Sequence, residues 1–162
     1  MSTASTFTVL FTDIASSTEH ALRLGDAHWD TQLTSYRAAM RRELRQFGGV
    51  EVDSAGDGFF AVFAAADGAV RCAQSIATQA DRLGLASRTG LHTGACQTGG
   101  EKISGVAVHV AARVMACAHP GEVLVTSAVG QALPLRASAA WHDAGPQGLR
   151  GLPGQWHLYQ VS

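Results

Sequence analysis

The stretch VEVDSAGDGFFAVF, residues 50–63, constrains the fold more than any other part of the sequence. It contains two short runs rich in β-branched and aromatic residues, 50–54 and 59–63, on either side of Gly56-Asp57-Gly58. Runs of this composition favour β-strands, and glycine with aspartate favours a tight turn between them. The stretch therefore predicts a β-hairpin with Asp57 at its turn.

The sequence before the hairpin predicts one buried strand and two helices. Residues 7–13, FTVLFTD, form a short apolar run and predict the strand. Residues 26–48 carry apolar side chains at helical spacing and predict a long amphipathic helix. Between them we expect a short helix that ends at Gly25 and begins with a capping box formed by Ser16 and Glu19.

Helices and strands also alternate after the hairpin. Helices are predicted at 67–83 and 105–118, and strands at 87–93, 122–126 and 156–161. Residues 127–155 contain recurring glycine and proline without clear periodicity, so no element is predicted there. The alternation implies a single α/β sandwich domain over residues 1–162, in which helices cover a mixed sheet.

The composition narrows the classes of function. The 162 residues are 46% hydrophobic and 15% charged, with a net charge of −1, which fits one globular domain and gives no reason to expect a nucleic-acid or membrane partner. No apolar run reaches transmembrane length. Cys72, Cys96 and Cys117 are far apart and odd in number, so we expect neither disulfides nor a zinc site, and a reduced cytoplasmic location.

Two carboxylates have the placement expected of metal ligands. Asp13 ends the first predicted strand, and Asp57 occupies the hairpin turn. Taken singly, Asp13 fits a helix cap and Asp57 fits a turn residue. If the strand lies beside the hairpin, however, both carboxylates meet at one edge of the sheet. Mg²⁺ needs only one or two carboxylates before substrate phosphates complete its shell, and two such ions about 4 Å apart can clamp a displacement at phosphorus.

Two further segments fit an anionic substrate. Residues 14–18 lead from the strand into a helix N-terminus, where free amides and the helix dipole attract phosphate, although an ordinary capped helix start needs no ligand. His109 and Arg113 are four residues apart, so they share one face of a helix otherwise lined by alanine and valine. That face predicts an anionic partner, which is either a substrate or a carboxylate of the same chain.

These segments, in this order, resemble the class III adenylyl/guanylyl cyclase catalytic domain, particularly its compact bacterial branch. The matching segments are TVLFTDIASSTEHALRLGD, GDGFFAVF with AVRCA after it, RTGLHTG, GVAVHVAARV, PGEVLVTS and LRGLPGQWHLYQV, and they cover nearly the whole chain. The resemblance implies a ferredoxin-like βαββαβ core with a mixed sheet covered by helices. It also implies an enzyme that closes a nucleoside triphosphate into a 3′,5′-cyclic monophosphate and releases pyrophosphate.

The resemblance assigns the metal ligands. Asp13 and Asp57 match the two metal-binding aspartates, and the Ile14 carbonyl adds a ligand. Each active site is expected to hold two Mg²⁺ or Mn²⁺ ions. The family builds its sites at a homodimer interface, so these residues would face the partner's cationic residues.

The resemblance also assigns the groups that contact the substrate. Arg113 matches the arginine that stabilises the transition state, and His109 takes the place of the asparagine that orients the ribose. Arg150 replaces the lysine that holds the terminal phosphates and adds a bidentate fork. The phosphate-binding segment after the first strand comprises Ala15, Ser16, Ser17 and Thr18.

The sequence departs from adenylyl members at the two positions that read the base. Asp53 stands where they carry lysine, and Lys102 stands where they carry aspartate. Adenine does not match this exchanged pair, whereas guanine and uracil present a ring N–H for Asp53 and a carbonyl oxygen for Lys102. Some bacterial relatives that make cyclic UMP or cyclic CMP in phage defence also depart from the adenylyl pair. We therefore expect GTP or UTP as substrate.

Several alternatives stay open at this point. In one alternative, Asp53 and Lys102 pair with each other and do not contact the base, which leaves ATP as a substrate. A catalytically inactive module that binds nucleotide, or a domain that only dimerises, are alternatives from other classes of protein. Inactive members usually lose a metal aspartate or the arginine, and Asp13, Asp57 and Arg113 are all present.

Overall fold

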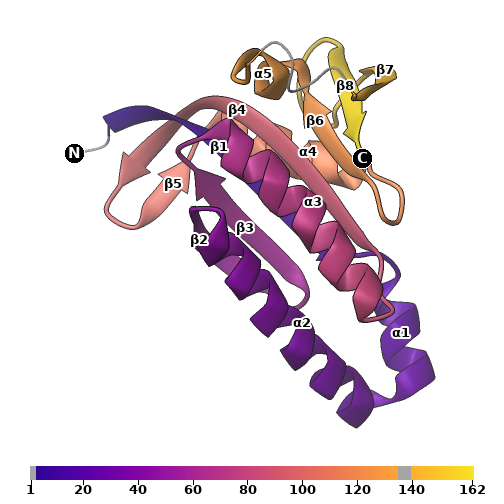
Figure 1. Ribbon diagram of the computed structural model, residues 1–162. Helices are drawn as coiled ribbons and strands as arrows, with labels where there is room; N and C mark the ends of the chain where they lie inside the picture. Colours follow the sequence, from indigo (N-terminus) through magenta and orange to yellow (C-terminus); the bar gives the residue numbers. More distant parts are fainter. Residues whose placement is uncertain (1–2, 135–139) are drawn as a thin grey trace.

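A computed structural model describes residues 3–134 and 140–162. Its elements follow in the order β1 (Thr3–Ile14), α1 (Ser17–Leu24), α2 (Asp26–Gln46), β2 (Gly49–Ala55), β3 (Gly58–Phe63), α3 (Ala66–Arg82), β4 (Ser87–Gly99), β5 (Lys102–Ser104), α4 (Val106–Ala116), β6 (Val123–Thr126), α5 (Ser127–Gln131), β7 (His142–Gln147) and β8 (Trp156–Val161). Figure 1 shows their arrangement along the chain.

The strands form one mixed sheet in the order β2-β3-β1-β4-β6-β8-β7, with β5 paired to β4 outside this path. β1 lies at the centre of the first half and pairs antiparallel with both β3 and β4. β6 joins β4 in parallel. The first four strands with their helices form the ferredoxin-like βαββαβ arrangement, so the predicted fold class is confirmed.

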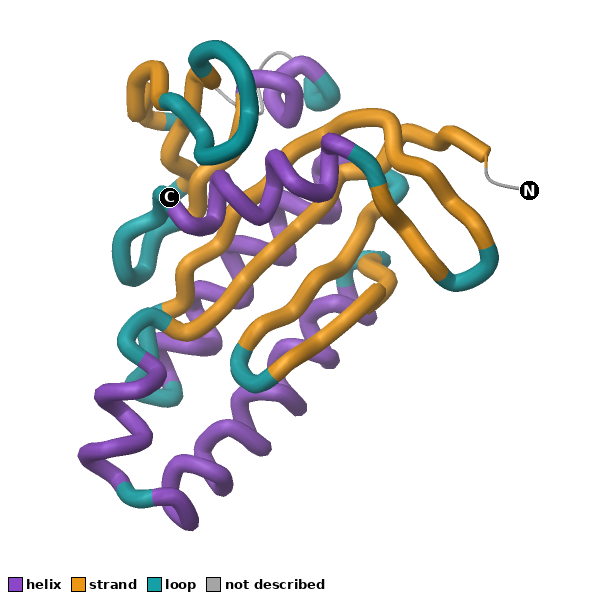
Figure 2. The backbone as a smooth tube through the Cα atoms, turned by 180° about the vertical axis from the view of Figure 1, so that it is seen from behind, coloured by secondary structure: helices purple, strands orange, loops and turns teal. Residues whose placement is uncertain are grey.

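Helices cover the two faces of the sheet unequally. α2 and α3 lie together on one face, where Leu10, Tyr36 and Ile76 are completely buried in the largest core cluster. Figure 2 shows the opposite face. On this face α4 crosses β4, and none of the described helices covers the β2–β3 hairpin. This leaves part of the sheet beside α4 without a helical layer.

α4 approaches β4 so closely that a glycine is required between them. A Cβ atom on Gly90 would lie 2.2 Å from the Met115 backbone nitrogen and 2.8 Å from the Ala111 carbonyl oxygen. Both contacts are with backbone, which cannot turn aside as a side chain would. Gly90 therefore fixes the height of α4 above the sheet.

The hairpin, the helices and the strands predicted from periodicity are confirmed to within a few residues. β1 and β4 are longer than predicted and pair along their whole length, from Thr3 opposite Thr98 to Ile14 opposite Ser87. β5, α5 and β7 were not predicted, and the unassigned stretch 127–155 includes residues outside the described part of the chain. In the described residues, no helix combines the length and apolarity that crossing a bilayer demands.

The capping box predicted for Ser16 and Glu19 is wrong. Ser16 has φ 59° and ψ 35°, the left-handed conformation, and its side chain makes no capping hydrogen bond. A serine cap normally requires an extended backbone, from which its hydroxyl reaches the amides of the first turn. The chain instead uses Ser16 to turn sharply from β1 into α1.

Candidate active site

Asp13 and Asp57 lie at the same end of the sheet, as the hairpin arrangement predicted. Asp13 is the penultimate residue of β1, and Asp57 occupies the turn of the neighbouring β2–β3 hairpin. The Ile14 backbone N–H donates a 2.8 Å hydrogen bond to Asp57 Oδ2. Both carboxylates line one cavity of about 320 Å³, which Asp53 also lines. We call this cavity, with its three aspartates, the acidic cavity.

Arg88 is part of this site and was not predicted. It stands directly opposite Asp13 in the β1–β4 pairing. Its Nε donates to Asp13 Oδ1 at 2.9 Å and its Nη2 donates to Asp13 Oδ2 at 2.6 Å. These hydrogen bonds to Asp13, together with the charges of Asp13 and Asp57, raise the pKa of Arg88 against the opposing effect of desolvation. The only sequence signal was an arginine at the start of a strand that pairs with β1.

A second arginine supports the turn that carries Asp57. Arg37 of α2 donates from Nε to the Gly56 carbonyl oxygen at 2.8 Å, and its Nη2 contacts the same oxygen. Gly56 has φ 58°, a conformation that glycine adopts at little cost. The position of Asp57 is therefore fixed from two sides, by α2 through the turn and by β1 through the Ile14 amide.

The acidic cavity rests on a buried polar layer. Thr12 donates to the Arg88 carbonyl oxygen at 2.9 Å and lies 2.9 Å from the Thr89 hydroxyl. The Tyr36 hydroxyl lies close to Thr12 beneath the carboxylates, but it forms no hydrogen bond of good geometry with the described residues. Desolvation raises the pKa of Tyr36 well above its usual range, and the charges of Asp57 and Asp13 act in the same direction.

Aromatic side chains form the apolar wall of the acidic cavity. The rings of Phe11 and Phe60 stack with centroids 4.6 Å apart and planes at 12°. Met115 of α4 also lines the cavity. Asp53 is exposed at its rim, where its Oδ1 accepts a hydrogen bond from the Ser54 amide at 2.8 Å. A flat aromatic ring bound in the acidic cavity would contact the apolar rings of Phe11 and Phe60 and the carboxylate of Asp53.

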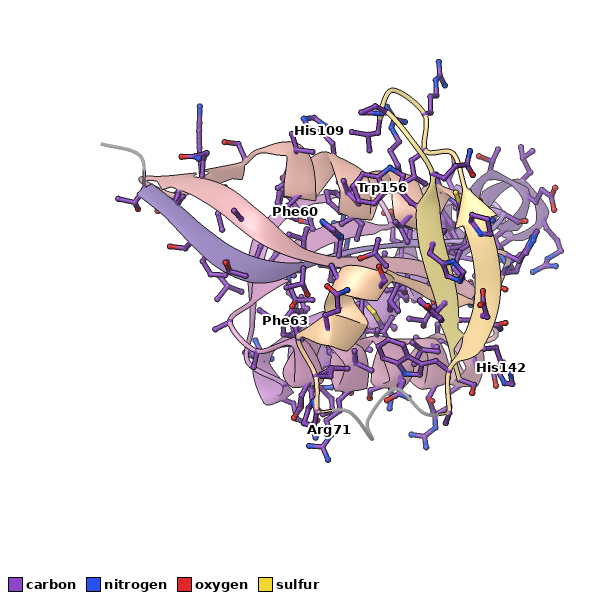
Figure 3. The ribbon with its side chains drawn as sticks, turned by 90° about the horizontal axis from the view of Figure 1, so that it is seen from above. Phe60, Phe63, Arg71, His109, His142 and Trp156 are labelled. Atoms are coloured by element: carbon purple, nitrogen blue, oxygen red, sulfur yellow. The ribbon has the colours of Figure 1, made fainter. Side chains whose placement is uncertain are left out.

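The predicted cationic residues lie elsewhere. His109 and Arg113 are exposed on α4, Lys102 is exposed on β5, and Arg150 is exposed in the loop before β8. None of the four lines the acidic cavity. Figure 3 shows His109 on the outer surface of α4, on the same side of the sheet as Phe60, with Phe63 toward the opposite helices. Arg113 and His109 make no ion pair or hydrogen bond within the described part of the chain, so no carboxylate there serves as their partner.

Sheet register separates Asp53 from Lys102 within one protomer. Asp53 pairs with Phe60, and Phe60 with Phe11 of β1. Lys102 pairs with Gly99, which follows Thr98, the partner of Thr3 at the other end of β1. With about 3.4 Å per residue, the eight steps along the strand from Thr3 to Phe11 span roughly 27 Å. The two side chains therefore cannot form an ion pair inside one chain.

The segment after β1 fits an anion only in part. The Ala15 amide already donates to the Ala86 carbonyl oxygen at 2.7 Å, so its N–H group is engaged within the chain, and the contact from Ala15 to phosphate stays a prediction. Ser17 and Thr18 lie in the first turn of α1, where backbone amides have no helical partner. Ser16 precedes them and is exposed.

The donor set of the acidic cavity suits a hard divalent cation with few protein ligands. Asp57 keeps Oδ1 available, and Asp13 carries two further carboxylate oxygens, each of which accepts one hydrogen bond from Arg88. No group of three or more histidine, cysteine, aspartate or glutamate side chains in the described residues has the geometry of a complete metal site. Mg²⁺ normally takes only one or two carboxylates and leaves the remaining positions to water and phosphate. The residues present therefore fit Mg²⁺ or Mn²⁺ better than a metal that needs a full protein shell.

Comparison with known proteins identifies the family. An uncharacterized protein of Mycobacterium tuberculosis is 33% identical over 155 residues, which is 91% of this chain and 53% of that protein, so this chain spans about half of its relative. The adenylyl cyclase CyaB from P. aeruginosa has a similar structure, with a TM-score of 0.88, 22% identity, and coverage of 100% of this chain and 96% of that chain. An adenylate/guanylate cyclase/hydrolase from Silicibacter pomeroyi has a TM-score of 0.86 at 26% identity and covers 99% of this chain and 98% of its own. Residues 1–162 match the family model described as the adenylate and guanylate cyclase catalytic domain, and the chain belongs to that family.

Proposed function

We propose that this chain converts a nucleoside triphosphate into a 3′,5′-cyclic nucleoside monophosphate and pyrophosphate. In this reaction the ribose 3′-oxygen forms a bond to the α-phosphorus while the bond from that phosphorus to the bridging oxygen of pyrophosphate breaks. The observation that carries the proposal is the pair of carboxylates, Asp13 and Asp57, on one cavity in a chain of the cyclase family. The cyclic product would serve as a second messenger.

Asp13, Asp57 and the Ile14 carbonyl would hold two Mg²⁺ or Mn²⁺ ions. When bound, these ions supply activation of the 3′-hydroxyl and neutralisation of the phosphate charge. Ile14 contributes in a second way, because its amide fixes Asp57 with a 2.8 Å hydrogen bond. Because Arg37 also holds the hairpin turn, the chain keeps Asp57 oriented before any ligand arrives.

The cationic residues would act on the substrate directly. Arg113 would stabilise the negative charge that develops on the pentavalent phosphorus, and Arg150 would bind the terminal phosphates that leave as pyrophosphate. His109 would orient the ribose. The first-turn amides of Ser17 and Thr18 would bind phosphate oxygens at the positive end of α1.

A complete active site requires two copies of the chain. The acidic cavity and the exposed cationic residues of α4 are separate within one protomer, and neither half has its partner there. The sheet face beside α4 carries the stacked Phe11 and Phe60, and Val106 at the start of α4 is 64% exposed. A second protomer that covers this face would bring its Arg113 to the acidic cavity and bury the apolar surface. We therefore propose a homodimer with two sites at its interface.

The base is proposed to be guanine or uracil. Asp53 lies at the rim of the acidic cavity and would accept a ring N–H, while Lys102 of the second protomer would donate to a carbonyl oxygen. The roughly 27 Å that separates them along one sheet removes the reading in which they neutralise each other within a chain. ATP remains the competing substrate, in which case this pair does not read the base.

The test is a panel of the four nucleoside triphosphates with Mg²⁺ or Mn²⁺, in which pyrophosphate is measured and the nucleotide product is identified. Wild-type protein should form a cyclic nucleotide, and Asp13→Ala and Asp57→Ala should each abolish it while the fold is retained. Asp30→Ala, which removes an exposed carboxylate of α2, is the matched control and should retain activity. If dimeric wild-type protein yields no product with any of the four nucleotides, the chain is an inactive module of this family and the proposal fails.

A further inference from the structure

Both oxygens of Asp13 are occupied by a side chain of the same protomer. Arg88 donates from two nitrogens to the two oxygens, at 2.9 and 2.6 Å. A guanidinium in this bidentate arrangement takes one lone pair of each oxygen in the plane of the carboxylate. Asp57, by contrast, accepts a hydrogen bond from the Ile14 backbone amide at Oδ2 and keeps Oδ1 available.

The contact is built into the sheet. Asp13 and Arg88 are direct partners in the antiparallel β1–β4 ladder, so their side chains leave the same face of the sheet side by side. The pair is only partly exposed, at 30% for the Arg88 side chain and 21% for that of Asp13, so water screens it less than a surface pair. Asp57 lies close enough for its charge to act on Arg88 as well.

We propose that Arg88 is the resident counter-ion of Asp13, and that a divalent cation competes with its guanidinium for the Asp13 carboxylate. Arg88 then sets the metal affinity of the site, because the cation competes with a positive group for the same oxygens. This inference rests on the proposed role of Asp13 as a metal ligand. Arg88 could have the opposite effect only by holding Asp13 in the orientation that the metal needs. In that case the removal of Arg88 weakens metal binding.

The two roles are separated by measuring Mn²⁺ binding to the full chain without nucleotide, by electron paramagnetic resonance of the free ion. Arg88→Gln removes the charge and should bind Mn²⁺ about fivefold more tightly than the wild type, the size expected for loss of a partly exposed, charge-assisted pair. Arg88→Lys keeps the charge but loses the fork, and should give a smaller gain. Circular dichroism of each variant verifies that it is folded, and Arg88→Lys decides the question if Arg88→Gln does not fold.

Arg41→Gln is the matched control. Arg41 forms a similar pair with Glu51, with its Nε 3.0 Å from Oε1, and neither residue lines the acidic cavity. The substitution changes the net charge by the same amount and should leave the Mn²⁺ affinity within about twofold of the wild type, since only screened long-range charge is altered.

Asp13→Asn distinguishes the failure of this inference from the failure of the proposed function. If Asp13→Asn does not weaken Mn²⁺ binding, the metal is not held by Asp13 and the proposed metal site is wrong. If Asp13→Asn weakens binding while Arg88→Gln leaves it unchanged or weakens it, the metal site stands and the competition by Arg88 is refuted. Tighter binding by Arg88→Gln that disappears in the double variant with Asp13→Asn supports the inference.

Discussion

Acid should destabilise this protein through His92, a buried histidine of β4. Its side chain is 8% exposed, its Nδ1 lies 2.7 Å from the Thr126 hydroxyl, and its ring meets Trp156 edge-on at 5.7 Å. Desolvation lowers the pKa of His92 to about 4, from an ordinary value of 6.5. The folded protein therefore keeps this ring neutral in a pH range where the unfolded chain protonates it.

The sign and size of the effect follow from this difference. As pH falls from 6.5 toward 4, the unfolded state binds a proton that the folded state does not, so the free energy of unfolding decreases. The loss is about 1.36 kcal/mol for each pH unit, which amounts to about 2 kcal/mol between pH 7.5 and pH 5. Urea unfolding at those two pH values, at one protein concentration, measures it.

Two variants separate this cause from others. His92→Gln removes the titrating ring, and its free energy of unfolding should fall by about 2 kcal/mol less than that of the wild type over the same pH interval. Thr126→Val removes the hydrogen bond but leaves the ring buried, so the wild-type pH dependence should persist. If wild type and His92→Gln lose the same free energy between pH 7.5 and pH 5, His92 is not held neutral by burial and the reasoning is refuted.

Three other outcomes are expected. Arg113→Ala should lower the rate of cyclisation about 10²–10⁴-fold. Mixing the Arg113→Ala and Asp57→Ala chains should restore part of the activity through heterodimers, and no recovery despite demonstrated subunit exchange would reject the shared site. The wild type should prefer GTP or UTP over ATP by about 10²–10⁴-fold in kcat/KM, and the double exchange Asp53→Lys with Lys102→Asp should raise kcat/KM for ATP relative to GTP and UTP. A wild type that prefers ATP, with no change on exchange, would show that the pair does not read the base. Tyr36→Phe should keep or raise the free energy of unfolding by up to about 1 kcal/mol; a clear loss in urea unfolding would reveal a hydrogen bond to its hydroxyl.

Local pattern was sufficient for the elements that carry strong periodicity. The apolar spacing of α2 and the turn residues around Asp57 are properties of short stretches, and they located the helix and the hairpin correctly. β7 contains Gly145 and Pro146, which disfavour a strand, and among the described strands it pairs with β8 alone, so nothing local predicted it. β5 has three residues and exists because β4 extends far enough to pair with it.

The candidate site likewise contains residues that the local sequence predicts and contacts that depend on strand pairing. Asp13 and Asp57 stand out in the sequence because each ends or interrupts an apolar strand. The pairing of Arg88 with Asp13 depends on the register between two strands 75 residues apart, which no short stretch encodes. The failed capping box at Ser16 has a similar origin, since the left-handed turn there is imposed by the geometry between β1 and α1 rather than by the residue itself.

The contact between Gly90 and α4 has a consequence for regulation. Because the α4 backbone is seated directly on β4, sliding of the helix along the sheet would force backbone atoms against each other, and we expect α4 and β4 of one protomer to move together. In the proposed homodimer, α4 of one protomer serves one active site while its acidic cavity serves the other. A small rotation of one protomer against its partner would therefore open or close both sites together. A partner or ligand that changes the angle between the two protomers would then switch the proposed cyclic nucleotide synthesis on or off, without rearrangement of a loop within either protomer.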